Sequence, residues 1–221
     1  YIEEHIPKNI NYLFYLDPDV ICLKNPESQL HKLINNLSKS KFVIAAHTEA
    51  LDQAKRRFQE LKMQNNTYFN AGVMLIDFQK WLNQNTSVNL LKQLDDIEEK
   101  IELWDQDVLN AYFDGKFLEL GQELNYMNTY IQNIDESKLN EIYFLHFSGK
   151  YKPWTVKGVN IKLGTIYHSN YELATGKKYH IDNNWKKQAI KDLKIIIFSG
   201  NIFKIKNPIT YLWYCFRYLI K

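Results

Sequence analysis

The stretch INYLFYLDPDV at residues 10–20 decides the fold class. It begins with an apolar and aromatic run, Ile10–Leu16, which stops at the polar triplet Asp17-Pro18-Asp19 and is followed by further apolar residues. A short apolar run that ends in polar residues is typical of a strand buried in a parallel sheet. We therefore expect a parallel strand at residues 10–16 with two carboxylates at its carboxyl end.

Strand and helix patterns alternate along the rest of the chain. Apolar runs predict strands at residues 41–46, 68–77, 117–120 and 142–146. Helical patterns occur at residues 28–36, 49–62, 78–82, 87–101, 105–114 and 165–173. In the second of these helices we expect Arg56 and Arg57 to be exposed. Strands that alternate with helices indicate an α/β fold.

Composition excludes several classes of protein. The chain has 221 residues, of which 45% are apolar and 24% charged, as is ordinary for a globular protein of one domain, or of one domain with an appendage. Low Gly and Pro content excludes collagen-like chains, and no apolar run reaches the roughly 18 residues of a membrane-spanning helix. Tyr1 opens no basic-then-apolar leader, so we expect no signal peptide. Cys22 and Cys215, far apart in sequence, fit a reducing compartment.

The net charge of +3 hides an asymmetry. Residues 1–149 carry 14 basic and 22 acidic side chains, whereas residues 150–221 carry 14 basic and 3 acidic ones. Residues 186–221 combine eight Lys or Arg with seven aromatic residues, a mixture that favours an interfacial helix on an anionic membrane. The alternative is a helix packed on the body, and no recognised motif favours nucleic acid. We expect a domain at residues 1–185 and a membrane-associating tail at 186–221.

Three residues are candidate ligands of a divalent cation. In open α/β sheets ligands bind beyond the carboxyl ends of strands, where Asp17 and Asp19 can converge on one ion. His146 ends the expected strand at 142–146, and one imidazole among oxygen ligands suits Mn²⁺ better than Mg²⁺ or Ca²⁺. The alternatives are a solvated turn for the two aspartates and a structural role for the histidine.

Two other segments carry residues suited to a phosphate or a sugar. In the loop GKYKPW at residues 149–154, Gly149 lets the backbone approach a phosphate and Lys152 supplies positive charge. After Asn70, the small residues Ala71 and Gly72 let a ligand lie against the backbone while the amide of Asn70 binds hydroxyls. Close packing of a strand against a helix explains the small residues equally well.

The segment Trp104-Asp105-Gln106-Asp107 is a fourth candidate. Acidic residues are favourable in the first turn of a helix, so that a helix N-terminus is the simplest interpretation. Such a turn can also face a pocket.

Together, D-x-D, F-N-A-G-V-x-L-x-D, D-Q-D and H-F-x-G-x-x-K-P-W occur in an order that resembles the family 8 glycosyltransferases over about residues 7–155. The resemblance implies one GT-A-type nucleotide-diphospho-sugar transferase fold, in which helices flank a Rossmann-like mixed sheet. It implies a retaining enzyme that uses a nucleotide sugar. Bacterial members of this family build lipopolysaccharide and capsule.

The resemblance also implies roles for individual residues. Asp17, Asp19 and His146 would bind Mn²⁺ or Mg²⁺. Gly149 and Lys152 would contact the diphosphate of a UDP-sugar. Four positions would surround the donor sugar: Asn70, Ala71, Asp105 and Gln106. We expect same-face attack with Gln106 as a polar stabiliser, and a double displacement through Asp105 is the alternative.

The chain departs from the family pattern in two places. Pro18 stands where the middle residue of D-x-D is more often small. We also expect the chain to lack an N-terminal segment that carries the first strand of the sheet and much of the uridine pocket. That departure favours a second hypothesis, a non-catalytic remnant that binds glycans or membranes. A third hypothesis is another metal-dependent phosphate-transfer enzyme, such as a nucleotidyltransferase.

The leading hypothesis is a Mn²⁺-dependent hexosyltransferase. It would move galactose or glucose from UDP-galactose or UDP-glucose to a glycan or lipid-linked saccharide of lipopolysaccharide, lipooligosaccharide or capsule. The tail would contact an anionic membrane. The expected location is cytoplasmic, at the inner face of the bacterial cytoplasmic membrane.

Overall fold

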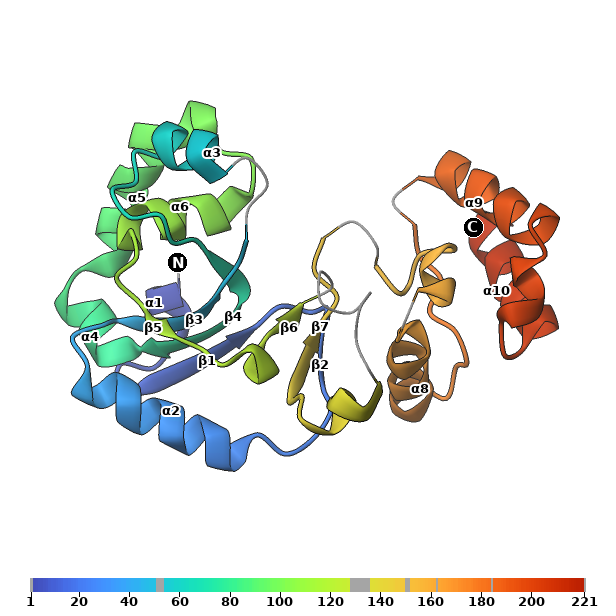
Figure 1. Cartoon of the computed structure of the whole chain (residues 1–221), viewed down its shortest axis with the longest axis horizontal. Helices are drawn as coiled ribbons and strands as arrows, with labels where there is room; N and C mark the ends of the chain where they lie inside the picture. Colours follow the sequence, from blue (N-terminus) through green and yellow to red (C-terminus); the bar gives the residue numbers. More distant parts are fainter. Residues whose placement is uncertain are drawn as a thin grey trace. The chain divides into compact units, whose positions relative to one another are not determined.

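The computed structural model of the chain describes residues 2–50, 54–127, 136–149, 152–161, 163–183 and 185–220. The chain folds into two compact units (Figure 1). Unit 1 comprises residues 1–126 and 139–145, and unit 2 comprises residues 127–138 and 146–221. The domain boundary expected after residue 185 stays a prediction. Each unit is described by itself.

Unit 1 is built on a four-stranded mixed sheet in the order β1-β4-β3-β5. Strand β4 pairs antiparallel with β1 and with β3, and β3 pairs parallel with β5. The prediction of a buried, parallel first strand is therefore wrong: β1 is antiparallel to β4 and only partly buried, with Tyr15 and Leu16 exposed. An apolar run carries no information on strand direction, and among the described strands β1 pairs only with β4, at one edge of this sheet. The bounds are Tyr12–Leu16 for β1, Phe69–Asp77 for β4, Ile44–Thr48 for β3 and Leu118–Glu119 for β5.

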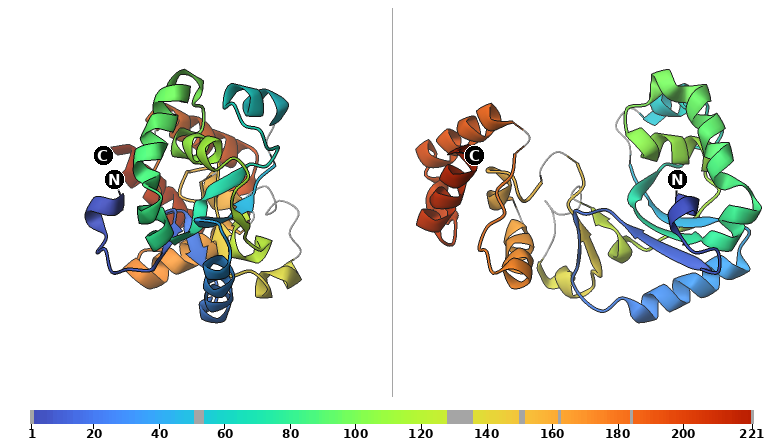
Figure 2. Two further views of the ribbon diagram at one scale, coloured as in Figure 1. Left: turned by 90° about the vertical axis from the view of Figure 1, so that its left-hand side faces the viewer. Right: turned by 180° about the vertical axis from the view of Figure 1, so that it is seen from behind.

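The central strand β4 is buried over all nine residues, so that both faces of the sheet must be covered. Met74 and Ile76 pack in one cluster with Trp81 and Phe113, whereas Val73 and Leu75 pack in another with the helix at residues 27–39. Figures 1 and 2 show α2 along one face of the sheet and α4, α5 and α6 on the other. Their bounds are Glu27–Lys39, Phe78–Asn83, Thr86–Ile97 and Trp104–Phe113.

Most helices expected in this half of the chain are confirmed, but one exposure prediction is wrong. Helix α3 covers Ala54–Glu60, within the expected range 49–62, of which residues 51–53 lie outside the described part. Arg56 is exposed, whereas Arg57 is only 3% exposed. Arg57 points inward because its guanidinium pairs with Asp107, 2.6 Å away. Short helices also lie at Ile2–His5 (α1), Glu98–Lys100 (η1), Gln122–Leu124 (η2) and Glu136–Asn140 (η3).

A second, three-stranded sheet has the order β2-β7-β6. Its strands are Val20–Cys22 (β2), Phe144–His146 (β7) and Tyr126–Met127 (β6), and the boundary between the units passes through β6 and β7. The loop Asp17-Pro18-Asp19 therefore joins β1 of the first sheet to β2 of the second. This connection fixes both ends of the D-x-D segment.

Unit 2 is helical. Its described elements after β7 are α8 (Gly164–Thr175), α9 (Lys186–Phe198), α10 (Pro208–Ile220), η4 (Gly158–Asn160) and η5 (Asn201–Lys204). Helices α9 and α10 pack with the preceding segment in one core that includes Val156, Tyr179, Ala189, Tyr211 and the free thiol Cys215. One face of the tail is thus buried within its own unit. Among the described helices, none has both the length and the hydropathy that crossing a bilayer requires.

Candidate functional site

The D-x-D loop is fixed by backbone hydrogen bonds. The N–H of Asp17 donates to the carbonyl of Gly72 at 2.8 Å, and the N–H of Val20 donates to the carbonyl of Asp17 at 3.1 Å. The hydroxyl of Tyr15 donates to a carboxylate oxygen of Asp17 at 2.7 Å. Burial, together with this hydrogen bond, raises the pKa of Tyr15, which stays protonated and able to donate. The loop thus holds Asp17 against the F-N-A-G strand.

The predicted metal ligands are brought together. One ligand atom from each of Asp17, Asp19 and His146 lies within 4.8 Å of the other two. His146 follows Leu145 on β7, the strand that is hydrogen-bonded to β2, into which the D-x-D loop leads. Asp19 is 5% exposed and His146 is 2% exposed. Two carboxylate oxygens and one imidazole nitrogen fit a divalent cation such as Mn²⁺.

A network of side-chain amides lies on the first residues of β4. The carboxamide oxygen of Gln106 accepts from the N–H of Ala71 at 2.9 Å and from Nδ2 of Asn70 at 3.3 Å. Glu49 accepts from both amides, from Nδ2 of Asn70 at 3.1 Å and from Nε2 of Gln106 at 3.3 Å. Asn125 donates to Oδ1 of Asn70 at 3.0 Å. The predicted sugar-site residues Asn70, Ala71 and Gln106 are therefore in direct contact.

Gly72 is joined to the same network through the backbone. Its N–H donates to Oδ1 of Asn70 at 3.0 Å, while its carbonyl accepts from the N–H of Asp17. Gly72 thus lies between the amide network and the D-x-D loop. This position joins the two groups of candidate residues within unit 1.

Asp107 fixes the start of helix α6. It is fully buried and accepts from the hydroxyl of Tyr68 and from Arg57, each at 2.6 Å, and from the backbone N–H groups of Glu102 and Leu103. Burial acts to raise its pKa, but these hydrogen bonds hold the pKa of Asp107 below its usual value. The second aspartate of D-Q-D is thus a structural anchor, which places Gln106 one residue before it.

Asp105 makes no hydrogen bond to the amide network within the described part of the chain. Its side chain is exposed and lines a largely apolar cavity of about 590 Å³ together with Tyr15 and Trp104. Trp104 is 82% exposed and adopts a backbone φ of 51°. Of the two residues predicted to act in catalysis, the structure therefore joins only Gln106 to Asn70 and Ala71.

The residues predicted to bind the diphosphate follow β7. Gly149 has a φ of 77°, a left-handed conformation that favours glycine, and open space surrounds the position of its absent side chain. The ammonium group of Lys152 donates to the carbonyl of Phe147 at 3.0 Å. Gly158 lies so close to the carbonyl of Lys152 that a Cβ would approach it to 1.9 Å. Residues 150 and 151 lie outside the described part of the chain.

Sequence reasoning missed four residues of this region: Tyr15, Glu49, Asn125 and Gly158. Tyr15 stands two residues before Asp17, a spacing that could have suggested the hydrogen bond. Glu49 and Asn125 belong to none of the four motifs, and nothing local in the sequence marks them. Gly158, the last residue of K-P-W-T-V-K-G, could have been found from the sequence, because a glycine in a loop often permits a close backbone approach.

Structural comparison supports the fold class. The galactosyltransferase LgtC, solved in complex with donor and acceptor sugar analogs, superposes with a TM-score of 0.56 at 18% identity, covering 85% of this chain and 68% of LgtC. An active-site mutant of LgtC gives a TM-score of 0.52 at 22% identity, over 69% of this chain and 58% of that one. The expected GT-A-type fold is thus confirmed.

Sequence comparison identifies the family. A lipopolysaccharide 1,2-glucosyltransferase of Escherichia coli K12 is 26% identical over 201 residues, which cover 85% of this chain and 54% of the relative. General stress protein A of Bacillus subtilis 168 is 30% identical over 167 residues, 66% of this chain and 54% of that protein. The chain spans about half the length of the curated relatives it matches. The model of glycosyl transferase family 8 matches residues 1–158, and the chain belongs to that family.

Proposed function

We propose that the protein transfers a hexose from UDP-galactose or UDP-glucose to a glycan acceptor, with retention of configuration at the anomeric carbon. The observation that carries the proposal is the convergence of Asp17, Asp19 and His146 within 4.8 Å. The names of two relatives support the substrate class. One is the lipopolysaccharide 1,2-glucosyltransferase, and the other is a lipopolysaccharide 1,3-galactosyltransferase of Salmonella typhimurium. The second relative is 26% identical over 162 residues, which cover 69% of this chain and 47% of that protein.

Asp17, Asp19 and His146 are the residues that would hold the cation, with Mn²⁺ preferred over Mg²⁺ because of the imidazole ligand. A bound divalent cation supplies Lewis-acid stabilisation of a diphosphate leaving group. Tyr15 keeps one oxygen of Asp17 in a fixed direction by its hydrogen bond at 2.7 Å. Lys152 and the backbone at Gly149 are the groups proposed to bind the diphosphate, since both follow His146 closely in the chain.

The amide network is proposed to bind the donor sugar. Asn70 and Gln106 are held by each other and by Glu49, so that their polar atoms have fixed directions before a ligand arrives. Ala71 presents almost no side chain, and its N–H is already taken by Gln106 at 2.9 Å. A sugar lying against this strand would meet oriented amide groups and would not have to order them.

Same-face attack is the proposed route to retention. A double displacement needs a carboxylate directly beneath the reacting carbon. Asp105 lines the apolar cavity beside Trp104, whereas Gln106 is the residue bonded to the strand proposed to bind the sugar. This arrangement favours Gln106 as a polar stabiliser over Asp105 as a nucleophile.

The tail at residues 186–221 is proposed to associate with an anionic membrane, on the inner face of the bacterial cytoplasmic membrane, where lipid-linked acceptors are met. Helix α10 buries Tyr211 and Cys215 and leaves Ile209, Phe216 and Ile220 largely exposed. An exposed apolar strip on a helix that also carries Arg217, within a basic segment of the chain, suits the interface of an anionic bilayer. Residues 1–185 are the proposed catalytic domain.

Calorimetry with the full chain tests the proposal in two steps. Mn²⁺ is titrated alone, and UDP is then titrated with Mn²⁺ and with EDTA. We expect UDP binding to require the metal, and Asp17→Asn to weaken it about 100-fold, because the variant removes a carboxylate charge from the metal site. Asp95→Asn, an exposed aspartate of α5, is the matched control and should bind like the wild type.

Release of sugar from UDP-glucose or UDP-galactose then reports turnover and the choice of donor. Metal-independent UDP binding, or equal affinity in both aspartate variants, would contradict the metal site. A folded chain that binds Mn²⁺ but no UDP would favour the non-catalytic alternative.

A further inference from the structure

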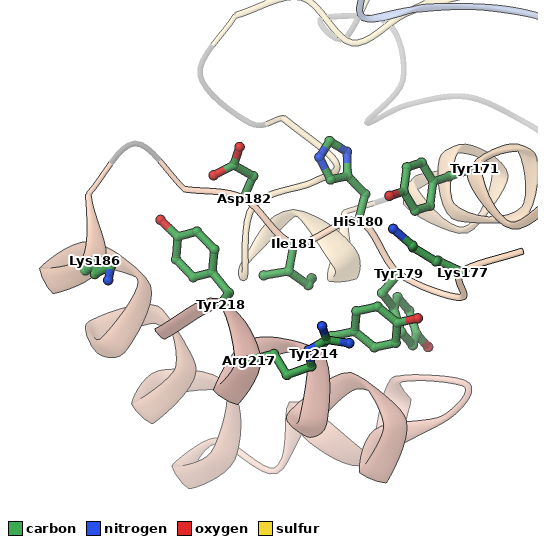
Figure 3. Close-up of a pocket in the computed structure, with 10 residues that line it drawn as sticks. All are labelled: Tyr171, Lys177, Tyr179, His180, Ile181, Asp182, Lys186, Tyr214, Arg217 and Tyr218. Carbon is green, nitrogen blue, oxygen red and sulfur yellow. The ribbon is translucent and has the colours of Figure 1, made fainter. Parts of the chain in front are cut away.

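Unit 2 contains a cavity that the proposed transfer reaction does not use. It has a volume of about 480 Å³ and lies between the end of α8, the segment at residues 177–182 and helix α10 (Figure 3). Ile181 lies in the middle of the surrounding side chains. The described residues that line it all belong to unit 2.

Positive charge dominates the wall of this cavity. Lys177, Lys186 and Arg217 come from three different elements, and Asp182 is the one carboxylate among the described residues of the wall. Within the described part of the chain, no carboxylate lies within 4.0 Å of any of these three cations. Arg217 instead lies over the ring of Trp213 at 4.7 Å, an arrangement that leaves the guanidinium N–H groups able to donate. Unneutralised cations from several directions attract a compact anion.

Aromatic rings form the rest of the wall and are held in place by one another. Tyr171 stacks on His180 with ring centroids 4.9 Å apart and planes 11° apart. Tyr214 meets Tyr179 edge to face at 6.1 Å. The hydroxyl of Tyr218 donates to the carbonyl of Asn183. Rings fixed in this way offer ready-made apolar faces with hydroxyl groups at their edges, which suit a ring-shaped ligand that is apolar on one face and polar at its rim.

His180 adds a neutral polar group. Its Nδ1 lies 2.6 Å from the hydroxyl of Tyr167, and burial lowers the pKa of His180, with Asp182 opposing the shift. The imidazole is therefore neutral at pH 7 and does not add to the charge of the three cations. Its role in the wall is a hydrogen-bonding surface stacked beneath Tyr171.

We propose that this cavity binds a phosphorylated saccharide, with the phosphate against Lys177 and Arg217 and the sugar ring against the tyrosines. An uncharged glycan would leave the cations without partners, and inorganic phosphate would leave the aromatic faces bare. The binding site rests on unit 2 alone. That the bound saccharide is the phosphorylated part of the acceptor rests on the proposed function.

The test is calorimetric titration of the full chain with glucose 6-phosphate, glucose and inorganic phosphate. We expect glucose 6-phosphate to bind at least about tenfold more tightly than either of the other two, because only it uses both parts of the wall. Comparable affinity for inorganic phosphate, or no saturable binding of glucose 6-phosphate below about 10 mM, would overturn the proposal.

A pair of double variants locates the site. Lys177→Gln with Arg217→Gln removes two cations of the cavity, and we expect the affinity for glucose 6-phosphate to fall at least about tenfold. Lys191→Gln with Lys194→Gln removes the same charge from α9, outside the cavity, and should change little. Equal losses in both variants would show general charge attraction and would overturn the site. Circular dichroism confirms that each variant is folded.

Two further arms separate the possible sources of the signal. Vesicles of phosphatidylglycerol are offered to the same variants, and if they bind through Lys177 and Arg217 while glucose 6-phosphate does not, the cavity serves a lipid headgroup and the saccharide proposal is wrong. UDP with Mn²⁺ is titrated in parallel. If the chain binds glucose 6-phosphate but no UDP, the cavity site is supported and the proposed transfer is contradicted. If it binds UDP but no glucose 6-phosphate, only the cavity site is contradicted.

Discussion

The two units handle polar side chains in opposite ways. In unit 1 the candidate sugar-binding groups satisfy one another, since Glu49 accepts from both Asn70 and Gln106. In unit 2, Lys177 and Arg217 face a cavity without an ion-pair partner among the described residues. A satisfied network has one geometry and can select a ligand by shape and hydrogen bonding, whereas unpaired cations select by charge. We therefore propose that unit 1 provides stereochemical selectivity and that unit 2 attracts an anion.

The largest expected effect comes from removing the ion pair that fixes the start of α6, the helix that carries Gln106 of the amide network. Arg57→Met removes the buried partner of Asp107, which is 0% exposed and accepts from Arg57 at 2.6 Å. Asp107 would keep its hydrogen bonds from Tyr68 and the backbone but lose its ion-pair partner, which should cost about 3 kcal/mol of unfolding free energy. Urea denaturation measures this loss.

Arg56→Met is the matched control for that experiment, because Arg56 is its sequence neighbour and pairs with Glu60 and Glu102 at the surface. We expect little change from it. If the two variants were equally stable, Asp107 would not depend on Arg57, and the order of the D-Q-D turn would have another origin.

A smaller effect on the rate of sugar transfer tests the role of the amide network in turnover. Gln106→Ala removes the group that accepts from Ala71 and Asn70, outside the predicted metal ligands. We expect UDP affinity to stay unchanged and sugar transfer to fall about 100-fold, as on removing one preorganised polar group from a transition state. Calorimetry and initial rates with UDP-glucose and UDP-galactose separate the two quantities.

Asp105→Asn is the companion variant, since it changes the adjacent carboxylate in the apolar cavity wall. Same-face attack predicts a smaller loss for it than for Gln106→Ala. Mass spectrometry that found a hexose covalently attached to Asp105 would reverse the assignment and establish a double displacement.

Much of unit 1 could be predicted because its signals are local. The apolar run before Asp17 and the buried segment at residues 68–77 were recognisable as strands, and the spacing of the four motifs pointed to the family. Strand direction could not be predicted, because the buried residues of β4 and the partly buried Tyr12, Leu13 and Phe14 of β1 would pack against the core in either direction. Direction depends on the pairing of segments far apart in the chain.

The errors and omissions have the same physical origin. Arg57 was expected to be exposed because its helix is charged, but its partner Asp107 lies 50 residues away. Glu49 and Asn125 enter the amide network only after folding brings them to Asn70. The charge asymmetry predicted a basic region in unit 2, yet a cavity with stacked tyrosines is a property of packing that no local pattern reports.

The smallest expected effect is a dependence of the stability of unit 2 on pH. His168 in unit 2 is 5% exposed, and burial lowers its pKa to about 4. Its Nε2 donates to the carbonyl of Pro153 at 3.0 Å, while its Nδ1 accepts from the N–H of His180 at 3.4 Å. Both nitrogens are thus used by the neutral ring, and protonation of Nδ1 would break the contact with His180.

The direction of the pH effect follows from proton binding. Between about pH 6.5 and about pH 4 the unfolded chain takes up a proton at His168 that the folded chain does not, so the stability contributed at pH 7 is lost as the pH falls. Lowering the pH from about 7 to about 5 should cost unit 2 about 2 kcal/mol from this residue. His180, whose pKa burial also lowers, acts in the same direction.

A pair of histidine variants measures this contribution. His168→Gln should flatten the pH dependence of the thermal midpoint, whereas His31→Gln, on the exposed surface of α2 in unit 1, should leave the slope unchanged. An unaltered slope in His168→Gln would mean that other groups of unit 2 titrate in its place. The hydrogen bond from neutral His168 to Pro153 would then contribute little to stability. The difference between the two units would depend on the charges of the cavity.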